Sequence, residues 1–382
     1  MNVKSRCGSQ PCWDVARIFS KILASINTTQ DGCGVCVKCY RLKTRSEVMA
    51  RVFIGIPTIN RPGFVQHTVN SVLAQSYRDI EVIVSDNCSE PGVADSVKAF
   101  IAELDDPRIR FHQQSENGGE YGQGRYFLGQ AEASEFFMIL HDDDLLHKDY
   151  LERAITCLEQ QPDCGVFVAN ANAIDENGQD IESEKQKFLR SLGRNDYSQG
   201  VISVRDTNLE CGFSPISGTF FRTANVRASG FVDDRGFGNY PFETDVFLRL
   251  GDLGVQGWYQ KEEMLSFRVH SGSMTSYMQF MDNEESLDAM ARLLEDRQYD
   301  GYAERRRKMI LSRLYRAKAM ITVRQGQFDR CRTYIKKSFK YNARSPKLWL
   351  IAPFALIAPW FLRWVLPEIA IVRQAPKVQQ KI

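Results

Sequence analysis

The stretch LHDDDLLHKDYL, Leu140–Leu151, begins at the last residue of the apolar run FFMIL and contains three adjacent carboxylates, Asp142, Asp143 and Asp144. An apolar run of about five residues is typical of a buried strand. The aspartates therefore come where a strand leaves its sheet, which in an open α/β sheet is the edge that binds ligands. Adjacent carboxylates repel one another unless they are neutralised. A hard divalent cation would neutralise them and would suit a diphosphate ligand, whereas the plainer interpretation is an acidic turn.

On both sides of this stretch, strand-like and helix-like patterns alternate. Short apolar runs that predict strands occupy residues 52–56, 80–85, 109–112 and 165–169. Helical spacing of apolar residues occurs in residues 64–75, 93–104, 125–133 and 150–160. Strands that alternate with helices predict βαβ units. We therefore expect an α/β fold with a Rossmann-like, mainly parallel sheet and flanking helices.

The pattern changes after residue 174. Residues 175–206 are polar and predict a loop region that could close over a ligand. Further on we expect strands at 216–222, 257–259 and 264–270, helices near Asn225 and at 245–253, and a turn at the sequence GFVDD. From about residue 282 to 341 the sequence is charged and helical in pattern. This part predicts a helical C-terminal region.

The composition excludes some classes of protein. The chain has 382 residues, 43% of them hydrophobic, which fits a globular protein with one large domain and an appendage, or two domains. A net charge of +2 argues against a broad electrostatic grip on nucleic acid. Arg17 and Lys21 interrupt the first apolar stretch, so no signal peptide is evident. We therefore expect a cytoplasmic protein that binds no nucleic acid.

Half of the ten cysteines lie near the N-terminus. The sequence CGVCVKC spaces Cys33, Cys36 and Cys39 as C-x-x-C pairs, which could ligate zinc or an iron–sulfur cluster. Alternatively, residues 1–48 are an extension outside the fold or outside the native product. That alternative carries more weight, because Met49 directly precedes the first predicted strand, as at the start of many cytosolic α/β domains.

The C-terminal tail contains an uncharged apolar run, residues 348–362. The run is too short to cross a membrane cleanly, and Pro353, Pro359 and Pro367 should break regular helix. Lysines and arginines flank it on both sides. Such a Trp-containing run suits a segment in a membrane interface, and a helix packed on the domain or on a second subunit is the equal alternative. The predicted parts are an extension (1–48), a globular domain (49–280), a helical region (281–345) and a tail (346–382).

The order of several motifs resembles a known family. Pro57-Thr58-x-Asn60 follows the first strand, and SVLAQSY, IEVIVSDNCS, ENGG and the acidic strand end come after it. This series, within residues 51–276, is similar to the family 2 glycosyltransferases, which have the GT-A fold. The resemblance implies inverting transfer of a sugar from a UDP-, GDP- or dTDP-linked donor to an acceptor hydroxyl. It also implies a role in making a cell-surface polysaccharide or glycan, with a glycan or lipid-linked acceptor.

The resemblance places donor-binding residues at the strand ends and in the helix that follows. The implied residues are Pro57, Thr58, Asn60, Asp86, Asn117 and Arg125. The carboxylate of Asp86 can accept a hydrogen bond from a base N–H, although Asp-Asn is also good turn chemistry. Arg125 could pair with a phosphate or with the acidic motif, or could be a solvated helix residue.

The acidic motif departs from the family at its first position. Most members carry D-x-D-D, and this chain has His141 where the first aspartate would be. The resemblance implies that Asp143 and Asp144 bind Mn²⁺ or Mg²⁺, with Asp144 as the principal ligand, and that Asp142 and Asp143 also contact the donor. His270, in FRVHSGSMTS, is similar to the family's R-x-H-x-x-S stretch. It would touch the metal or the diphosphate, or be a structural histidine.

The family's catalytic base is a carboxylate that precedes a helix, and the sequence FETDVFLR holds that place. Glu243 or Asp245 could take the proton of the acceptor hydroxyl, and the start of the helix at Asp245 slightly favours Asp245. Acidic residues also favour helix N-termini through the macrodipole, so one of the two would serve only that purpose. Ser217-Gly218-Thr219 resembles the small-residue stretch near the acceptor.

Two other functions compete with metal-assisted glycosyl transfer at the cytoplasmic face of a membrane. A non-catalytic protein that binds nucleotide-sugars would not need both the DDD and the ETD carboxylates, which this chain retains. A nucleotidyltransferase would need a glycine-rich, basic phosphate loop after the first strand, and PTINRPG is not one. We therefore expect a glycosyltransferase that works without a covalent enzyme intermediate.

Overall fold

The computed structural model describes residues 50–212, 214–230, 241–270 and 284–365. The chain divides into two compact units, Met1–Val48 and Met49–Ile382, and all described residues belong to the second. The possible ligand cysteines Cys33, Cys36 and Cys39 lie outside the described residues, as does most of the predicted turn GFVDD.

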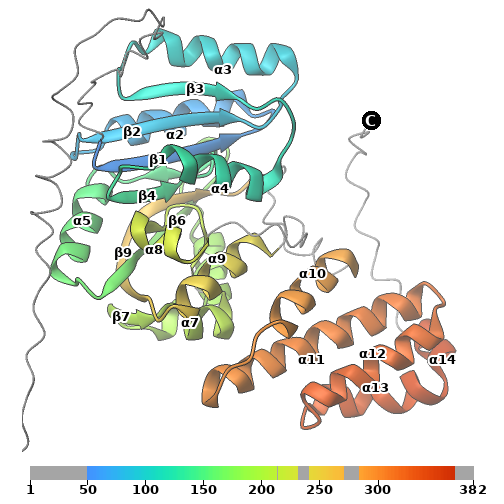
Figure 1. Ribbon diagram of the computed structural model, residues 1–382. Coiled ribbons are helices and arrows are strands. Elements are labelled where there is room, and N and C mark those ends of the chain that lie inside the picture. Colours follow the sequence, from blue (N-terminus) through green and yellow to red (C-terminus); the bar gives the residue numbers. More distant parts are fainter. Residues whose placement is uncertain (1–49, 213, 231–240, 271–283, 366–382) are drawn as a thin grey trace, which may run out of the picture. The chain divides into compact units, whose positions relative to one another are not determined.

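The described residues build a mixed, mostly parallel sheet of nine strands (Figure 1). In sheet order the strands are β3 (Ile109–Gln113), β2 (Ile80–Asp86), β1 (Val52–Thr58), β4 (Phe136–Ile139), β8 (Phe220–Arg222), β6 (Cys164–Ile174), β9 (Gln256–Arg268) and β5 (Leu145–Leu146), and β7 (Gly200–Ser203) pairs with β9. The first four are parallel neighbours, and β8 runs antiparallel to β4 and β6. The predicted α/β fold is confirmed.

Helices cover both faces of the sheet (Figure 1). On one face lie α2 (Pro62–Leu73), α3 (Pro91–Glu103) and α5 (Tyr150–Gln160), and on the other lie α4 (Gly119–Gln130), α8 (Thr223–Ala228) and α9 (Phe242–Asp252). Successive strand side chains point to opposite faces, so Ile54 of β1 packs under α2 while Phe53 packs under α4. Apolar side chains make up most of both clusters, so the sheet is packed on both faces.

The register of the parallel strands brings the predicted site residues to one edge. Thr58 at the end of β1 pairs with Asp86 at the end of β2, and Gly55 pairs with Ile139, the last residue of β4. The carboxyl ends of β1, β2 and β4 therefore lie side by side. Gly55 also lets α4 approach β1, because a Cβ there would lie 2.4 Å from the Phe127 ring.

Two sequence predictions about the second half of the domain are wrong. Residues 175–206, predicted as a loop region, contain α6 (Glu182–Ser191), a 3₁₀ turn (Arg194–Asp196), β7 and the start of α7 (Val204–Cys211). Within α6 only Leu189 is buried, so its apolar stripe is too sparse to show as a period. The two strands predicted at 257–259 and 264–270 are one strand, β9, with an irregularity opposite Asn170 that accommodates the polar sequence between them.

The helical C-terminal region consists of α10 (Glu284–Glu295), α11 (Gly301–Arg324), α12 (Phe328–Tyr341), α13 (Pro346–Ile357) and α14 (Pro359–Val365). One face of α13 is buried through Leu348, Ala352 and Ala355, which pack against α11 and α12. Pro353 does not break this helix, contrary to the sequence prediction, because the packed face holds it in place. Among the described residues, no helix combines the length and the apolar character needed to cross a membrane.

Candidate active site

The three aspartates follow β4 in a short loop, and all three are buried. Their exposed fractions are 4% for Asp142, 9% for Asp143 and 6% for Asp144, so the acidic turn that the sequence allowed is present but buried. Thr58 Oγ1 donates to Asp142 Oδ2 over 2.6 Å, and Arg61 Nη1 lies 3.3 Å from Asp142 Oδ1 and 3.2 Å from Asp143 Oδ2. The sequence analysis gave no role to Arg61.

The R-x-H stretch at the end of β9 closes over the same loop. The backbone N–H of Arg268 donates to Asp144 Oδ1 over 3.2 Å, and His270 Nε2 lies 3.1 Å from Asp143 Oδ2. The hydroxyl of Ser217 donates to the other oxygen of Asp144. The structure therefore brings His270 to the acidic loop, where the sequence analysis expected it.

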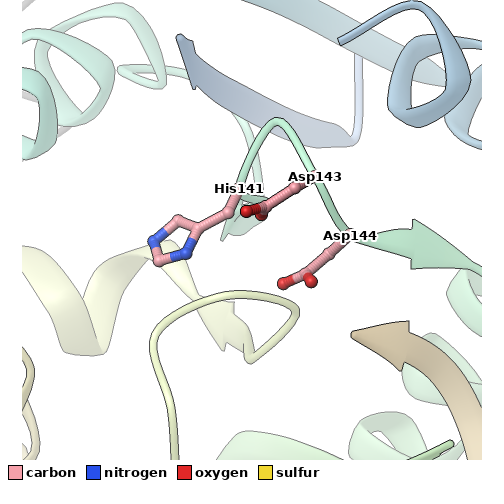
Figure 2. A group of neighbouring side chains, drawn as sticks. All are labelled: His141, Asp143 and Asp144. Atoms are coloured by element: carbon pink, nitrogen blue, oxygen red, sulfur yellow. The ribbon is translucent and has the colours of Figure 1, made fainter. Parts of the chain in front are cut away.

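His141, Asp143 and Asp144 form a group that could hold a metal ion (Figure 2). One ligand atom from each residue lies within 4.8 Å of the others. Two carboxylates and an imidazole suit Mn²⁺, and the carboxylates alone suit Mg²⁺. The chain thus has an imidazole, a possible nitrogen ligand, at the position where the family pattern has its first aspartate. His270 adjoins the same group through Asp143.

Burial and mutual repulsion change the acidity of the loop. Burial, with the neighbouring charge of Asp143, raises the pKa of Asp142 to about 6 and that of Asp144 to about 7. Burial alone would lower the pKa of His141, but the carboxylates of Asp144 and Asp143 outweigh it and raise that pKa. Asp142 and Asp144 therefore hold protons to a higher pH than free carboxylates do, and a bound cation would replace protons because metal ligands must be deprotonated.

Asp86, at the end of β2, has an oxygen that is buried and accepts no hydrogen bond from any described residue. Its side chain is 0% exposed, Oδ2 accepts from the Ser89 N–H over 2.9 Å, and Oδ1 has no partner. A buried acceptor without a partner costs about 1–3 kcal/mol. This orphaned oxygen lies on the ligand-binding edge, which makes it a candidate contact for a ligand N–H.

The other predicted donor residues join the loops around Asp86. Asn60, with a left-handed φ of 55°, accepts from the Glu90 N–H over 3.0 Å. Asn87 Nδ2 donates to Asn117 Oδ1 over 2.9 Å, so Asn117 lies beside the end of β2. Pro57 is the strand neighbour of Ser85.

Arg125 is placed differently from the other predicted donor residues. It is exposed on α4, and no contact between it and the acidic loop is found in the described part of the chain. The guanidinium groups that contact the loop belong to Arg61 and Arg268. The structure therefore does not bring Arg125 to the carboxylates, as the sequence analysis had allowed.

The two candidate bases in the first turn of α9 have different surroundings. Asp245 is fully buried and pairs with Arg249 over 2.9 Å and with Arg297 over 2.8 Å. Glu243 is half-buried, and its Oε1 accepts from the Ile216 N–H over 3.1 Å. Burial raises the pKa of Glu243, while His141 opposes the shift. The pair thus consists of one carboxylate held between two guanidinium groups and one that neighbours His141.

A second glutamate, Glu120, which was not predicted from the sequence, is close enough to Glu243 for the two charges to interact. Burial and the charge of Glu243 raise the pKa of Glu120 to about 7, while His141 opposes the shift. Glu120 stands in the first turn of α4. Acidic residues are common at that position of any helix, so its sequence position alone did not mark it as part of a site.

A short segment before β8 joins the glutamates to the aspartates. The backbone of Ile216 binds Glu243, while the next side chain, Ser217, binds Asp144 and accepts from the backbone N–H of His141 over 3.0 Å. The carboxylates of α9 and of the acidic loop therefore border one site, although about a hundred residues separate them in the sequence.

Comparisons with known proteins agree on one family. The family model described as "Glycosyl transferase family 2" matches residues 53–212. A Campylobacter jejuni protein named GalNAc(5)-diNAcBac-PP-undecaprenol beta-1,3-glucosyltransferase is 24% identical, over 66% of this chain and 78% of its own length. The succinoglycan biosynthesis protein ExoO of Rhizobium meliloti is 28% identical, over 36% of this chain but only 38% of its own length.

Solved structures show the same fold. The structure of S. aureus TarS 1–349 in complex with UDP-GlcNAc superposes with a TM-score of 0.58 at 15% identity, over 81% of this chain and 89% of that one. At this identity the likeness concerns the fold.

Proposed function

The chain belongs to glycosyl transferase family 2 and is a glycosyltransferase, and on that basis we propose that it transfers a sugar, with inversion, from a nucleoside-diphosphate donor to a hydroxyl of a glycan or lipid-linked acceptor. The relatives that act in glycan and polysaccharide synthesis support this setting. The C. jejuni relative is named for a substrate linked to undecaprenol, which supports a lipid-linked acceptor and work beside a membrane.

The orphaned oxygen of Asp86 is the observation that carries the donor assignment. Uracil, thymine and guanine each have a ring N–H that could donate to this carboxylate, whereas the corresponding ring nitrogen of cytosine is an acceptor. A buried acceptor gains most from a ligand that satisfies it. The donor is therefore a UDP-, dTDP- or GDP-sugar, and the UDP-GlcNAc complex of S. aureus TarS is in line with this choice.

The acidic loop would hold a divalent cation beside the donor diphosphate. Asp144 and Asp143 would be its ligands, with an imidazole from His141 or His270 completing the protein's share. When bound, Mn²⁺ or Mg²⁺ supplies positive charge that stabilises the departing nucleoside diphosphate. Arg61, whose guanidinium already contacts Asp142 and Asp143, adds a fixed positive charge at the same place.

Glu243 is the residue that we assign as the catalytic base. Its carboxylate accepts the proton of the acceptor hydroxyl while that oxygen attacks the anomeric carbon and the bond to the diphosphate breaks. A raised pKa brings a carboxylate closer to the working pH, which suits a general base. Asp245 is unsuited, because two guanidinium groups already hold its oxygens; this reverses the slight preference for Asp245 that the sequence suggested.

A thermal-shift panel tests the donor assignment. UDP-, dTDP- and GDP-sugars are compared with CMP-sugars, with and without Mn²⁺, on the wild type and on the Asp86→Ala variant. We expect one of the first three to raise the melting temperature in Mn²⁺, no response to CMP-sugars, and loss of the response in the variant. A response to CMP-sugars alone, or an undiminished response of Asp86→Ala, would contradict the role of Asp86.

A further inference from the structure

The last two described helices expose an apolar face. Its members are Trp349 (61% exposed), Leu350 (73%), Phe354 (44%), Ile357 (80%) and Trp360 (64%). We call these five side chains the α13–α14 face. Leu350, Phe354 and Ile357 are spaced four and three residues apart and so form a stripe along α13, with Trp349 next to Leu350. A contiguous exposed stripe of this kind marks an interaction surface more often than a scattered apolar residue does.

This face is left exposed although the helices are already packed. The opposite side of α13, with Leu348, Ala352 and Ala355, is buried in a cluster that also contains Val323 of α11 and Ile335 of α12. The helical region therefore has its own core without the five exposed side chains. The α13–α14 face is therefore not needed for packing within the helical region, and it is available to bind a partner.

The segment that carries the face is basic. The sequence contains no acidic residue between Asp329 and Glu368. Basic residues precede the uncharged run, and the exposed ones are Lys336, Lys337, Lys340, Arg344 and Lys347. Asp329 is paired with Arg332, which also contacts the end of α13. A segment that combines exposed tryptophans with an excess of exposed basic residues is complementary to a layer that is apolar inside and negatively charged outside.

We propose that the α13–α14 face docks on an anionic lipid bilayer, with Trp349 and Trp360 at the level of the headgroups. Tryptophan favours that level because its ring is apolar and its N–H is polar. Each basic residue near an anionic surface adds attraction. A second copy of the chain fits less well, because a symmetric contact through this face would bring the same lysines together. The described helices lie in the membrane plane in this arrangement and do not span it.

Vesicle sedimentation of the full chain tests the proposal. The vesicles are phosphatidylcholine alone, or phosphatidylcholine with a quarter phosphatidylglycerol. The test variant is Leu350→Ser with Ile357→Ser, and the matched control is Val201→Ser with Leu253→Ser, two aliphatic side chains in the rest of the domain that are 56% and 54% exposed. All four positions are exposed, so both variants should keep the wild-type melting temperature.

We expect the wild type and the control variant to bind the anionic vesicles. The partition coefficient of the test variant should be lower by roughly tenfold or more, since two of its apolar side chains no longer enter the bilayer. Binding to phosphatidylcholine alone should be weaker. Three results would overturn the proposal: wild type that stays in the supernatant, equal binding by test and control variants, or a wild-type dimer that only the test variant dissociates. The last would assign the face to a second copy. None of these readouts depends on sugar transfer.

Discussion

At the scale of single residues, burial and metal binding have opposite effects on the ionisation of the aspartates in the acidic loop. Burial makes Asp142 and Asp144 resist ionisation, which is why their pKa values rise to about 6 and about 7. As metal ligands they must be ionised. A cation that binds the loop as proposed would therefore replace protons, and the stability of the loop would depend on both. The sequence showed the cluster but not its burial, because burial comes from β9 and from the segment before β8.

The first prediction concerns pH. A carboxyl with a raised pKa keeps, in the folded state, a proton that the unfolded chain has released, so stability falls as pH rises through the interval between the two pKa values. The raised pKa of His141 acts in the same direction. With a chelator present, we expect the free energy of unfolding of the wild type to fall as pH rises from about 4 to about 7. The unfolding free energy of Asp144→Asn should fall less, since the asparagine has no proton to lose.

Melting curves with Mn²⁺ complete that test. Because the cation replaces protons, its stabilising effect on the wild type should grow as pH rises and should disappear in Asp144→Asn. Asp149→Asn is the control, since Asp149 is an exposed aspartate of the same sequence stretch. Equal gains from Mn²⁺ in all three proteins would mean that the cation binds elsewhere.

At the scale of elements, α9 is tied to α10 through Asp245. Its carboxylate pairs with Arg297 just beyond α10 and with Arg249 one turn along α9, and both pairs are largely shielded from water. Removing one partner of a buried pair leaves the other charge unpaired. The helical region therefore helps to hold the first turn of α9, in which Glu243 stands.

The prediction at this scale is that Asp245→Asn costs about 3–5 kcal/mol of unfolding free energy, measured by urea denaturation. Asp252→Asn is the matched control, because Asp252 pairs with the same Arg297 over 3.1 Å but is about one-third exposed; it should cost about 1 kcal/mol or less. If Asp245→Asn keeps the wild-type stability but loses turnover, Asp245 is the catalytic base and the assignment of Glu243 is wrong.

The sequence predicted strands and helices best where apolar residues fill most of the positions that become buried. The strands that became β1, β2 and β4 are continuous apolar runs, and α5 has a full apolar stripe. By contrast, α6 buries one residue fully, and α13 continues through Pro353 because tertiary packing outweighs local preference. The same packing means that truncation after Lys347 would remove core residues as well as the exposed face, so substitutions on that face are the cleaner test.

At the scale of the whole molecule, the site is assembled from segments far apart in the sequence. Strand ends could be predicted, since parallel strands share one edge, and this placed Thr58, Asp86 and the aspartates together. The partners of Glu243 and Asp245 could not be predicted, because they depend on how α9 meets Ile216 and Arg297. Local sequence does not contain such contacts.

The most direct test of the central claim is the turnover of Glu243→Gln. The donor found in the thermal-shift panel is used with Mn²⁺, release of nucleoside diphosphate gives the rate, and calorimetry gives donor affinity. We expect kcat to fall by roughly 10²–10⁴-fold, donor affinity to stay near that of the wild type, and folded Asp245→Asn to keep its turnover. A Glu243→Gln enzyme that turns over at the wild-type rate would contradict the account.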